Sequence, residues 1–81
     1  MSEHSVLTPL PGTFYRSPSP GTPAFVREGD AVTAETVIGV VELMKQFTEV
    51  LAGTAGTLSA FVVDDGDAVD GDQPVATVAA P

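Results

Sequence analysis

The fold is decided by one central stretch of the chain, Gly39-Val40-Val41-Glu42-Leu43-Met44-Lys45-Gln46-Phe47-Thr48-Glu49-Val50. Two runs of strand-forming residues, 36–43 and 47–51, lie on either side of a short polar break. Such a pair of runs is typical of a β-hairpin. Lys45 is the only lysine in the chain, and the break places it at the tip of this hairpin.

A single exposed lysine can serve as a post-translational attachment site, because no other side-chain amine competes with it, although an isolated lysine is more often an ordinary turn residue. We therefore interpret Lys45 as an attachment point and the rest of the chain as a rigid handle that presents it. The alternative is that Lys45 is an ordinary solvated turn residue. The flanking residues and an internal repeat around the hairpin favour the attachment interpretation.

The composition predicts one small domain that spans residues 1–81. Three basic and eleven acidic residues give a net charge of −8, which opposes binding to nucleic acids and to anionic membranes. The absence of cysteine excludes disulfides, thiolate metal sites and cysteine nucleophiles. Residues 1–4 resemble no secretory signal and are expected to form a flexible tail, and no apolar run reaches membrane-spanning length. We therefore expect a cytoplasmic protein.

Short strands separated by turn signals account for the whole chain. No segment shows a convincing helical period, so the fold class is all-β. The expected strands cover residues 5–8, 12–15, 36–43, 47–51, 56–63 and 74–78. A proline-rich segment at residues 17–24 is expected to form a stiff, thumb-like protrusion, because its prolines fix φ.

The chain also contains an internal repeat. Residues 26–32 align with residues 63–69 at an offset of 63 − 26 = 37, and both contain Gly-Asp-Ala-Val. Residues 12–14 align with residues 56–58 at an offset of 56 − 12 = 44. The difference, 44 − 37 = 7, places an insertion in the first half, where the proline-rich segment 17–24 lies.

Two similar halves of about four strands each follow from this repeat. Such halves can pack about a pseudo-twofold axis into a sandwich or flattened barrel of two four-stranded sheets. The Lys45 hairpin joins the halves, which places the lysine at one end of the molecule and the chain termini at the other.

With these features in place, the chain resembles the biotinyl domain of biotin carboxyl carrier proteins from about Val6 to Val78. It is most similar to the carrier of bacterial acetyl-CoA carboxylase. Three segments carry the resemblance: the opening Pro9-Leu10-Pro11-Gly12-Thr13-Phe14-Tyr15-Arg16, the thumb at residues 17–24, and Glu42-Leu43-Met44-Lys45-Gln46, which is similar to the Glu-Ala-Met-Lys-Met attachment motif. The resemblance implies a biotinyl/lipoyl-type fold, a hammerhead barrel.

The resemblance also implies a non-catalytic carrier with biotin joined to Lys45 by an amide bond. A biotin protein ligase would load the lysine and read the flanking Glu42, Leu43, Met44 and Gln46. A biotin carboxylase would then carboxylate the biotin, using ATP and bicarbonate, and a carboxyltransferase would receive the carboxyl group. The carrier would thus act as a swinging arm of the kind that raises the effective concentration at two active sites.

Two positions depart from the motif, since Leu43 stands where the family has alanine and Gln46 where it has a second methionine. Two alternatives to the biotin carrier therefore stay open. The first is a lipoyl carrier, against which Met44 and the proline-rich insertion argue. The second is an unmodified carrier-like interaction module, which Leu43 and Gln46 favour.

Other candidate sites have simpler explanations. Five clustered carboxylates could suggest a calcium site: Asp64, Asp65, Asp67, Asp70 and Asp72. Their spacing lacks the order of a calcium loop and matches turn chemistry, so we expect no metal. His4 stands alone near a terminus and supports no catalytic triad. Glu42 and Glu49 are better explained as outward-facing strand residues than as an acid/base pair.

Overall fold

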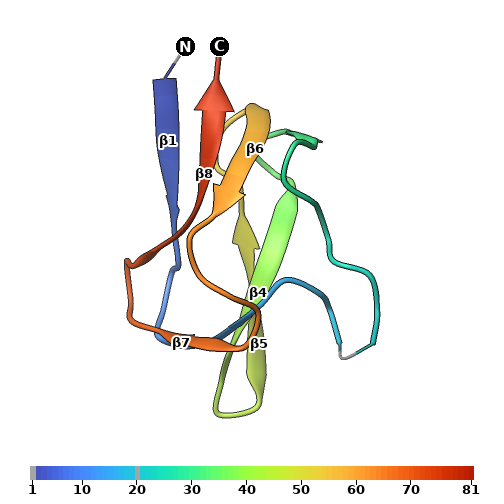
Figure 1. The fold of residues 1–81 in the computed structure, drawn as a ribbon. Helices are drawn as coiled ribbons and strands as arrows, with labels where there is room; N and C mark the ends of the chain where they lie inside the picture. Colours follow the sequence, from blue (N-terminus) through green and yellow to red (C-terminus); the bar gives the residue numbers. More distant parts are fainter. Residues whose placement is uncertain (1, 20) are drawn as a thin grey trace.

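The computed structural model describes residues 2–19 and 21–81, which form eight β-strands and no helix (Figure 1). The strands are β1 (Ser2–Leu7), β2 (Gly12–Tyr15), β3 (Ala31–Val32), β4 (Val37–Leu43), β5 (Gln46–Leu51), β6 (Gly56–Phe61), β7 (Asp67–Val69) and β8 (Pro74–Ala80). They build two four-stranded sheets with the orders β1-β8-β6-β3 and β5-β4-β2-β7. All pairings are antiparallel. The predicted all-β fold of two four-stranded sheets is confirmed.

The two sheets repeat one arrangement. Strands β1 and β2 begin 44 residues before β5 and β6, since 46 − 2 = 44 and 56 − 12 = 44. Strand β3 begins 37 residues before Ala68 in β7, since 68 − 31 = 37, and β4 begins 37 residues before β8, since 74 − 37 = 37. Replacing each strand by its equivalent converts one sheet order into the other. The pseudo-twofold relation predicted from the repeat is therefore present in the fold.

The turns of the two halves use the same hydrogen bonds. The backbone N–H of Arg27 donates to Oδ2 of Asp30 at 2.9 Å, and the equivalent N–H of Asp64 donates to Oδ2 of Asp67 at 2.9 Å. Short carboxylate side chains favour turns because they accept hydrogen bonds from nearby backbone N–H groups. Across residues 2–19 and 21–81, no three His, Cys, Asp or Glu side chains are arranged to hold a metal ion.

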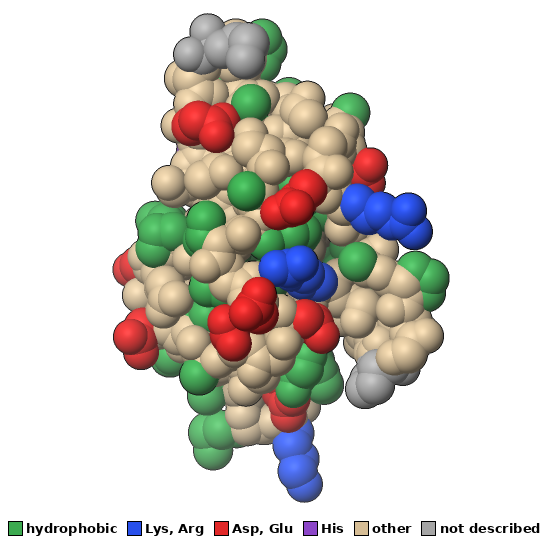
Figure 2. Space-filling view, viewed as in Figure 1, with side chains coloured by type: hydrophobic (Ala, Val, Ile, Leu, Met, Phe, Trp, Pro, Cys, Tyr) green, Lys and Arg blue, Asp and Glu red, His purple; other side chains and the backbone are tan. Residues whose placement is uncertain are grey.

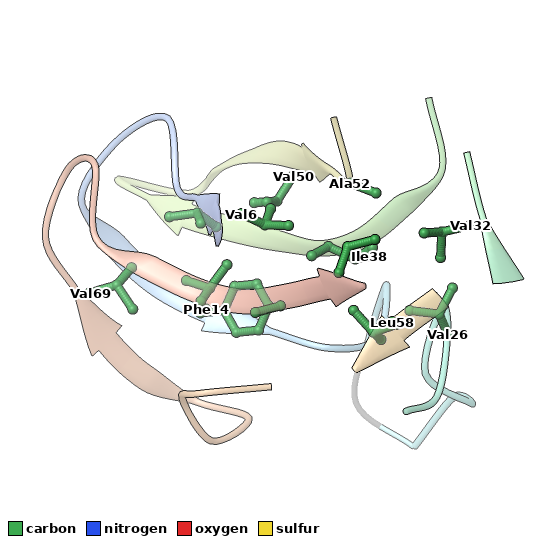
Figure 3. Close-up of a cluster of buried hydrophobic side chains, with 13 residues drawn as sticks. Val6, Phe14, Val26, Val32, Ile38, Val50, Ala52, Leu58 and Val69 are labelled. Atoms are coloured by element: carbon green, nitrogen blue, oxygen red, sulfur yellow. The ribbon is translucent and has the colours of Figure 1, made fainter. Parts of the chain in front are cut away.

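A hydrophobic core fills the space between the sheets (Figure 3). Its largest fully buried apolar side chains are Phe14, Ile38, Leu58, Val41, Val50, Val75 and Val78. Many come as equivalent pairs of the two halves, such as Phe14 with Leu58 and Ile38 with Val75. Burying such side chains is the main term that stabilises a domain of this size.

The hairpin formed by β4 and β5 lies at one end of the molecule, and both chain termini lie at the other (Figure 1). The principal extents are 37 × 25 × 19 Å, so the two ends are separated by the long dimension. This arrangement confirms the placement predicted from the repeat. The part of the chain that the structure describes contains no helix able to cross a bilayer.

The expected flexible tail at residues 1–4 is wrong for the described residues Ser2–His4, and Met1 lies outside the described range. These residues extend β1 and pair with Ala80–Val78 of β8. The free edge of β8 offers backbone donors and acceptors, so the N-terminal residues gain partners by continuing the strand. Strands β3 and β7 were not predicted individually, because their two or three residues sit next to turn signals.

Glycines at equivalent positions allow close approach of neighbouring strands. A Cβ atom on Gly12 would collide with the carbonyl oxygen of Glu42, and one on Gly56 would collide with the carbonyl oxygen of Ala79. Because these obstacles are backbone atoms of paired strands, they cannot move without disturbing the ladder.

We expect Gly56→Ala to destabilise the protein by about 1–3 kcal/mol, the usual cost of overpacking. Gly71→Ala is the matched control, because its Cβ would meet nothing closer than Pro11 Cδ at 3.6 Å. That variant should change stability by less than about 0.5 kcal/mol. Urea unfolding followed by circular dichroism measures both, and equal effects of the two substitutions would contradict the close packing at Gly56.

Candidate functional site

The hairpin between β4 and β5 turns in two residues. Leu43 pairs with Gln46, so Met44 and Lys45 form the entire loop. Both have positive φ, 52° for Met44 and 66° for Lys45. Positive φ at both central residues marks a type I′ turn, whose twist matches that of the flanking strands. Asn-Gly is the usual sequence there, so Met-Lys holds this turn against its local preference.

The side chains of this turn project into solvent. Met44 is 87% exposed, Lys45 is exposed, and Leu43 is 39% exposed. The only ion pair within the described residues joins Arg16 and Asp64, so the Lys45 amine has no carboxylate partner there. The amine is therefore available to a reactant that arrives from outside.

The base of the hairpin is fixed in the core. Strand β4 pairs with β2 on one side and with β5 on the other. Val41 and Val50, which lie a few residues from the tip, are fully buried. Strand β4 is internal to its sheet, and internal strands with buried side chains are among the parts of a domain that open least often. The base of the turn that carries Lys45 is thus anchored by buried side chains on both of its strands.

A pocket of about 300 Å³ lies beside the hairpin. It is lined by Tyr15, Ser17, Pro18, Ser19, Glu42, Phe47 and Asp65. The aromatic side of the pocket includes Phe47, which is 60% exposed in an edge strand. Exposed aromatic rings are enriched at binding surfaces.

The predicted protrusion at residues 17–24 leaves the sheet directly after β2, and Pro20 lies outside the described residues. Its root is closed by a hydrogen bond of 2.9 Å from the N–H of Phe25 to the carbonyl of Arg16. Within it, the Thr22 hydroxyl donates to the carbonyl of Ser19 at 2.5 Å. One wall of the pocket, Ser17–Ser19, therefore belongs to this protrusion.

The five residues predicted to form the site lie together at the tip. Glu42 and Leu43 end β4, Met44 and Lys45 form the turn, and Gln46 begins β5. Glu42 is half-buried and lines the pocket.

The sequence alone did not predict the pocket that Tyr15, Phe47 and Asp65 line. The alternation of exposed Phe47, Glu49 and Leu51 with buried Val50 could have indicated Phe47 as outward-facing. No local signal could have joined Tyr15 or Asp65 to the hairpin. Red side chains outnumber blue ones on the visible face of the molecule, in keeping with the net charge of −8 (Figure 2).

We expect Met44→Asn to stabilise the protein by about 0.5–1 kcal/mol, because asparagine tolerates positive φ and the exposed Met44 side chain loses little packing. Gln46→Asn is the matched control at an exposed strand position, where asparagine has no conformational advantage. Urea unfolding midpoints test both variants. A gain at Gln46, or none at Met44, would show that the turn does not impose positive φ.

Comparisons with known proteins extend the resemblance. The sequence pattern of the biotin/lipoyl family, described as "Biotin-requiring enzyme", matches residues 4–78. The biotin carboxyl carrier protein of acetyl-CoA carboxylase from Haemophilus influenzae is 41% identical over 78 residues, which cover 96% of this chain and 50% of that protein. The carrier of the same name from Chlamydia muridarum is 48% identical over 64 residues, which cover 79% of this chain and 39% of that protein.

The fold is also found in a solved structure, the urea carboxylase of Kluyveromyces lactis. The two superpose with a TM-score of 0.80 at 23% identity, over 98% of this chain and 6% of the carboxylase. The chain spans half or less of the two carrier proteins that it matches. Since the family pattern covers nearly all of its residues, the chain belongs to the biotin/lipoyl family of biotin-requiring enzymes.

Proposed function

We propose that Lys45 carries covalently attached biotin and that the chain is the carboxyl carrier of a biotin-dependent acetyl-CoA carboxylase. The observation that carries this proposal is the position of the only lysine, which stands in solvent at the tip of a two-residue turn. Family membership and the names of the relatives support biotin as the attached group.

The Lys45 amine is chemically suited to carry biotin through an amide bond. An unpaired amine can attack an activated carboxyl carbon after losing a proton; a C–N bond forms, and the activating group leaves with the electrons of the bond that it breaks. Lys45 then becomes a neutral amide, and the net charge changes from −8 to −9. Attached biotin would accept a carboxyl group in one active site and release it in another.

The scaffold contributes position rather than catalysis. Buried Val41 and Val50 hold the base of the hairpin, so Lys45 and whatever is attached to it extend from an anchored base. A tether on a rigid base keeps its end at a high effective concentration near a docked partner. The partners proposed are a biotin protein ligase, a biotin carboxylase and a carboxyltransferase, and the cytoplasmic location predicted from the sequence stays a prediction.

The residues around Lys45 are proposed as the surface that the ligase reads. Leu43, Met44 and Gln46 are all exposed around the tip. Glu42 precedes Leu43 in β4 and lies one residue further from the turn. The exposed thioether of Met44 offers a polarisable, adaptable contact.

Loading can be tested by co-expressing the chain with a biotin protein ligase and measuring its intact mass. We expect a single biotin-sized increment that maps to Lys45, and none in Lys45→Arg, which keeps the positive charge. A lipoyl-sized increment obtained with a lipoyl ligase instead would favour a lipoyl carrier.

The double variant Leu43→Ala/Gln46→Met, which restores the family motif at both positions, completes the experiment. If the natural chain stays unmodified while the double variant is loaded, the chain is an unmodified carrier-like module. If both are loaded, the two departures are tolerated by the ligase and the carrier proposal stands.

A further inference from the structure

The protrusion at residues 17–24 breaks the symmetry of the two halves. The chain takes 26 − 14 = 12 residues from Phe14 to Val26, but only 63 − 58 = 5 between the equivalent residues Leu58 and Val63. Among the described residues of this protrusion, 17–19 and 21–24, none belongs to a strand of either sheet. Their position beside the Lys45 hairpin must therefore be set by contacts outside the sheet ladders.

The backbone of Arg16 supplies two of these contacts. Its carbonyl accepts the 2.9 Å hydrogen bond from Phe25 that closes the root of the protrusion. Its N–H donates to Oδ1 of Asp65 at 2.7 Å, which ties the root to the loop between β6 and β7. Both ends of the protrusion are thus fastened at one residue.

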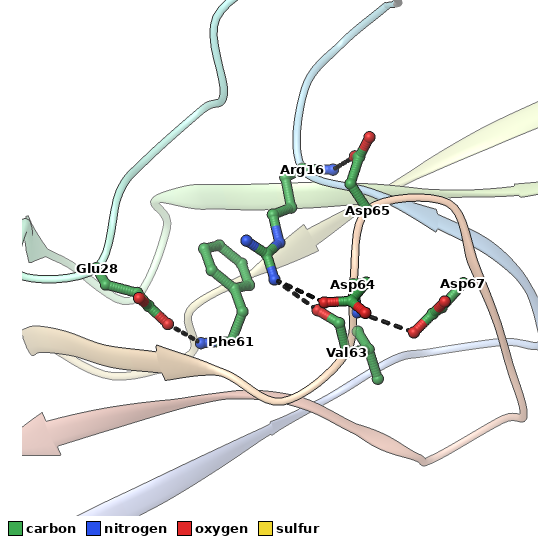
Figure 4. Close-up of polar contacts among 7 residues, drawn as sticks. All are labelled: Arg16, Glu28, Phe61, Val63, Asp64, Asp65 and Asp67. Carbon is green, nitrogen blue, oxygen red and sulfur yellow. Dashed lines mark hydrogen bonds and ion pairs between the residues drawn. The ribbon is translucent and has the colours of Figure 1, made fainter.

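The side chain of Arg16 fixes this residue to the opposite half of the molecule (Figure 4). Its guanidinium carbon lies 4.3 Å from the centroid of the Phe61 ring, and Nη2 donates to the carbonyl of Val63 at 2.7 Å. The Phe61 ring in turn lies 6.2 Å from that of buried Phe14. Stacking plus a directed hydrogen bond needs the planar fork of arginine, which lysine lacks.

The hydrogen bond between Arg16 and Asp65 has a counterpart at the equivalent turn of the other half. Glu28 and Asp65 are equivalent residues, since 65 − 28 = 37, and each accepts a backbone N–H from the other half. Glu28 holds Phe61 at 2.9 Å, and Asp65 holds Arg16 at 2.7 Å. Only the second bond lies at the root of an insertion, and only Asp65 also lines the pocket beside the hairpin.

We propose that Arg16, held by Asp65, is a positioning residue that fixes the pocket wall Ser17–Ser19 next to the Lys45 hairpin, so that a biotin carboxylase docking at the hairpin meets a preformed surface. The link to docking rests on the proposed carrier function. Without this anchor the wall becomes mobile, and a partner must order it on binding, which weakens association. The chemistry on the attached group is unaffected.

The first test measures the anchor in the unmodified protein. Arg16→Gln should speed hydrogen exchange of the Phe25 amide at least roughly tenfold relative to wild type, while β4 amides keep their protection. Arg27→Gln is the matched control, because it removes the same charge from an exposed residue whose hydrogen bonds among the described residues go to Asp30 and not to the protrusion root. Equal exchange at Phe25 in the two variants would overturn the proposal.

The second test uses biotinylated carrier, with loading verified by mass, as the substrate of a biotin carboxylase. We expect Arg16→Gln to raise KM for the carrier roughly tenfold with kcat within about twofold, and Arg27→Gln to change neither by more than about twofold. Arg16→Lys should keep most of the rise in KM, because it restores only the charge. Wild-type behaviour of Arg16→Lys, or an unchanged KM in Arg16→Gln, would overturn the positioning role.

The two tests separate this inference from the proposed function. If the wild-type chain takes up no biotin, the carrier proposal fails, while hydrogen exchange at Phe25 still decides whether Arg16 anchors the wall. If loading is normal and exchange at Phe25 is unchanged in Arg16→Gln, the anchor is overturned and the carrier proposal stands.

Discussion

The antiparallel pairing of β4 with β5 is the constraint on which the rest of the structure depends. Its register, Leu43 opposite Gln46, leaves only Met44 and Lys45 to make the turn. A shift of one residue would exchange the inner and outer faces of the strands, which would expose Val41 and bury polar neighbours. Core packing therefore fixes the register, the register fixes the turn, and the turn projects the lysine away from the body of the domain.

The two halves are nearly symmetric, but the Lys45 turn has no equivalent turn in the other half. Leu43 is equivalent to Ala80 and Gln46 to Ser2, since 80 − 43 = 37 and 46 − 2 = 44. The place that corresponds to the Lys45 turn in the other half is thus the gap between the chain termini. A second departure from symmetry, the insertion after Arg16, lies on the side of the hairpin. The end of the molecule that carries Lys45 is therefore also the end that carries the insertion.

How much was predictable depends on the range of the interactions involved. The hairpin and strand β2 were predictable because alternation and turn residues are local signals. The repeat predicted two similar halves related by a pseudo-twofold axis, which the two sheet orders reproduce. The pairing of Ser2–His4 with β8 was not, because it joins opposite ends of the chain. The pocket and the Arg16 anchor could not be predicted either, because they join residues far apart in the sequence; Arg16 and Asp65 are 49 residues apart. The positive φ of Met44 and Lys45 also contradicts local preference, and only the tertiary register imposes it.

Solution NMR of the chain before and after loading with biotin examines the rigid presentation of Lys45 directly. Coupling constants should give positive φ for Met44 and Lys45 in both forms, with a cross-strand contact between Leu43 and Gln46. Chemical-shift changes on loading should be confined to the hairpin and the adjoining pocket, while the signals of the core stay in place. Negative φ at these two residues, a different register, or shifts spread through the core would contradict a lysine held out on a fixed hairpin.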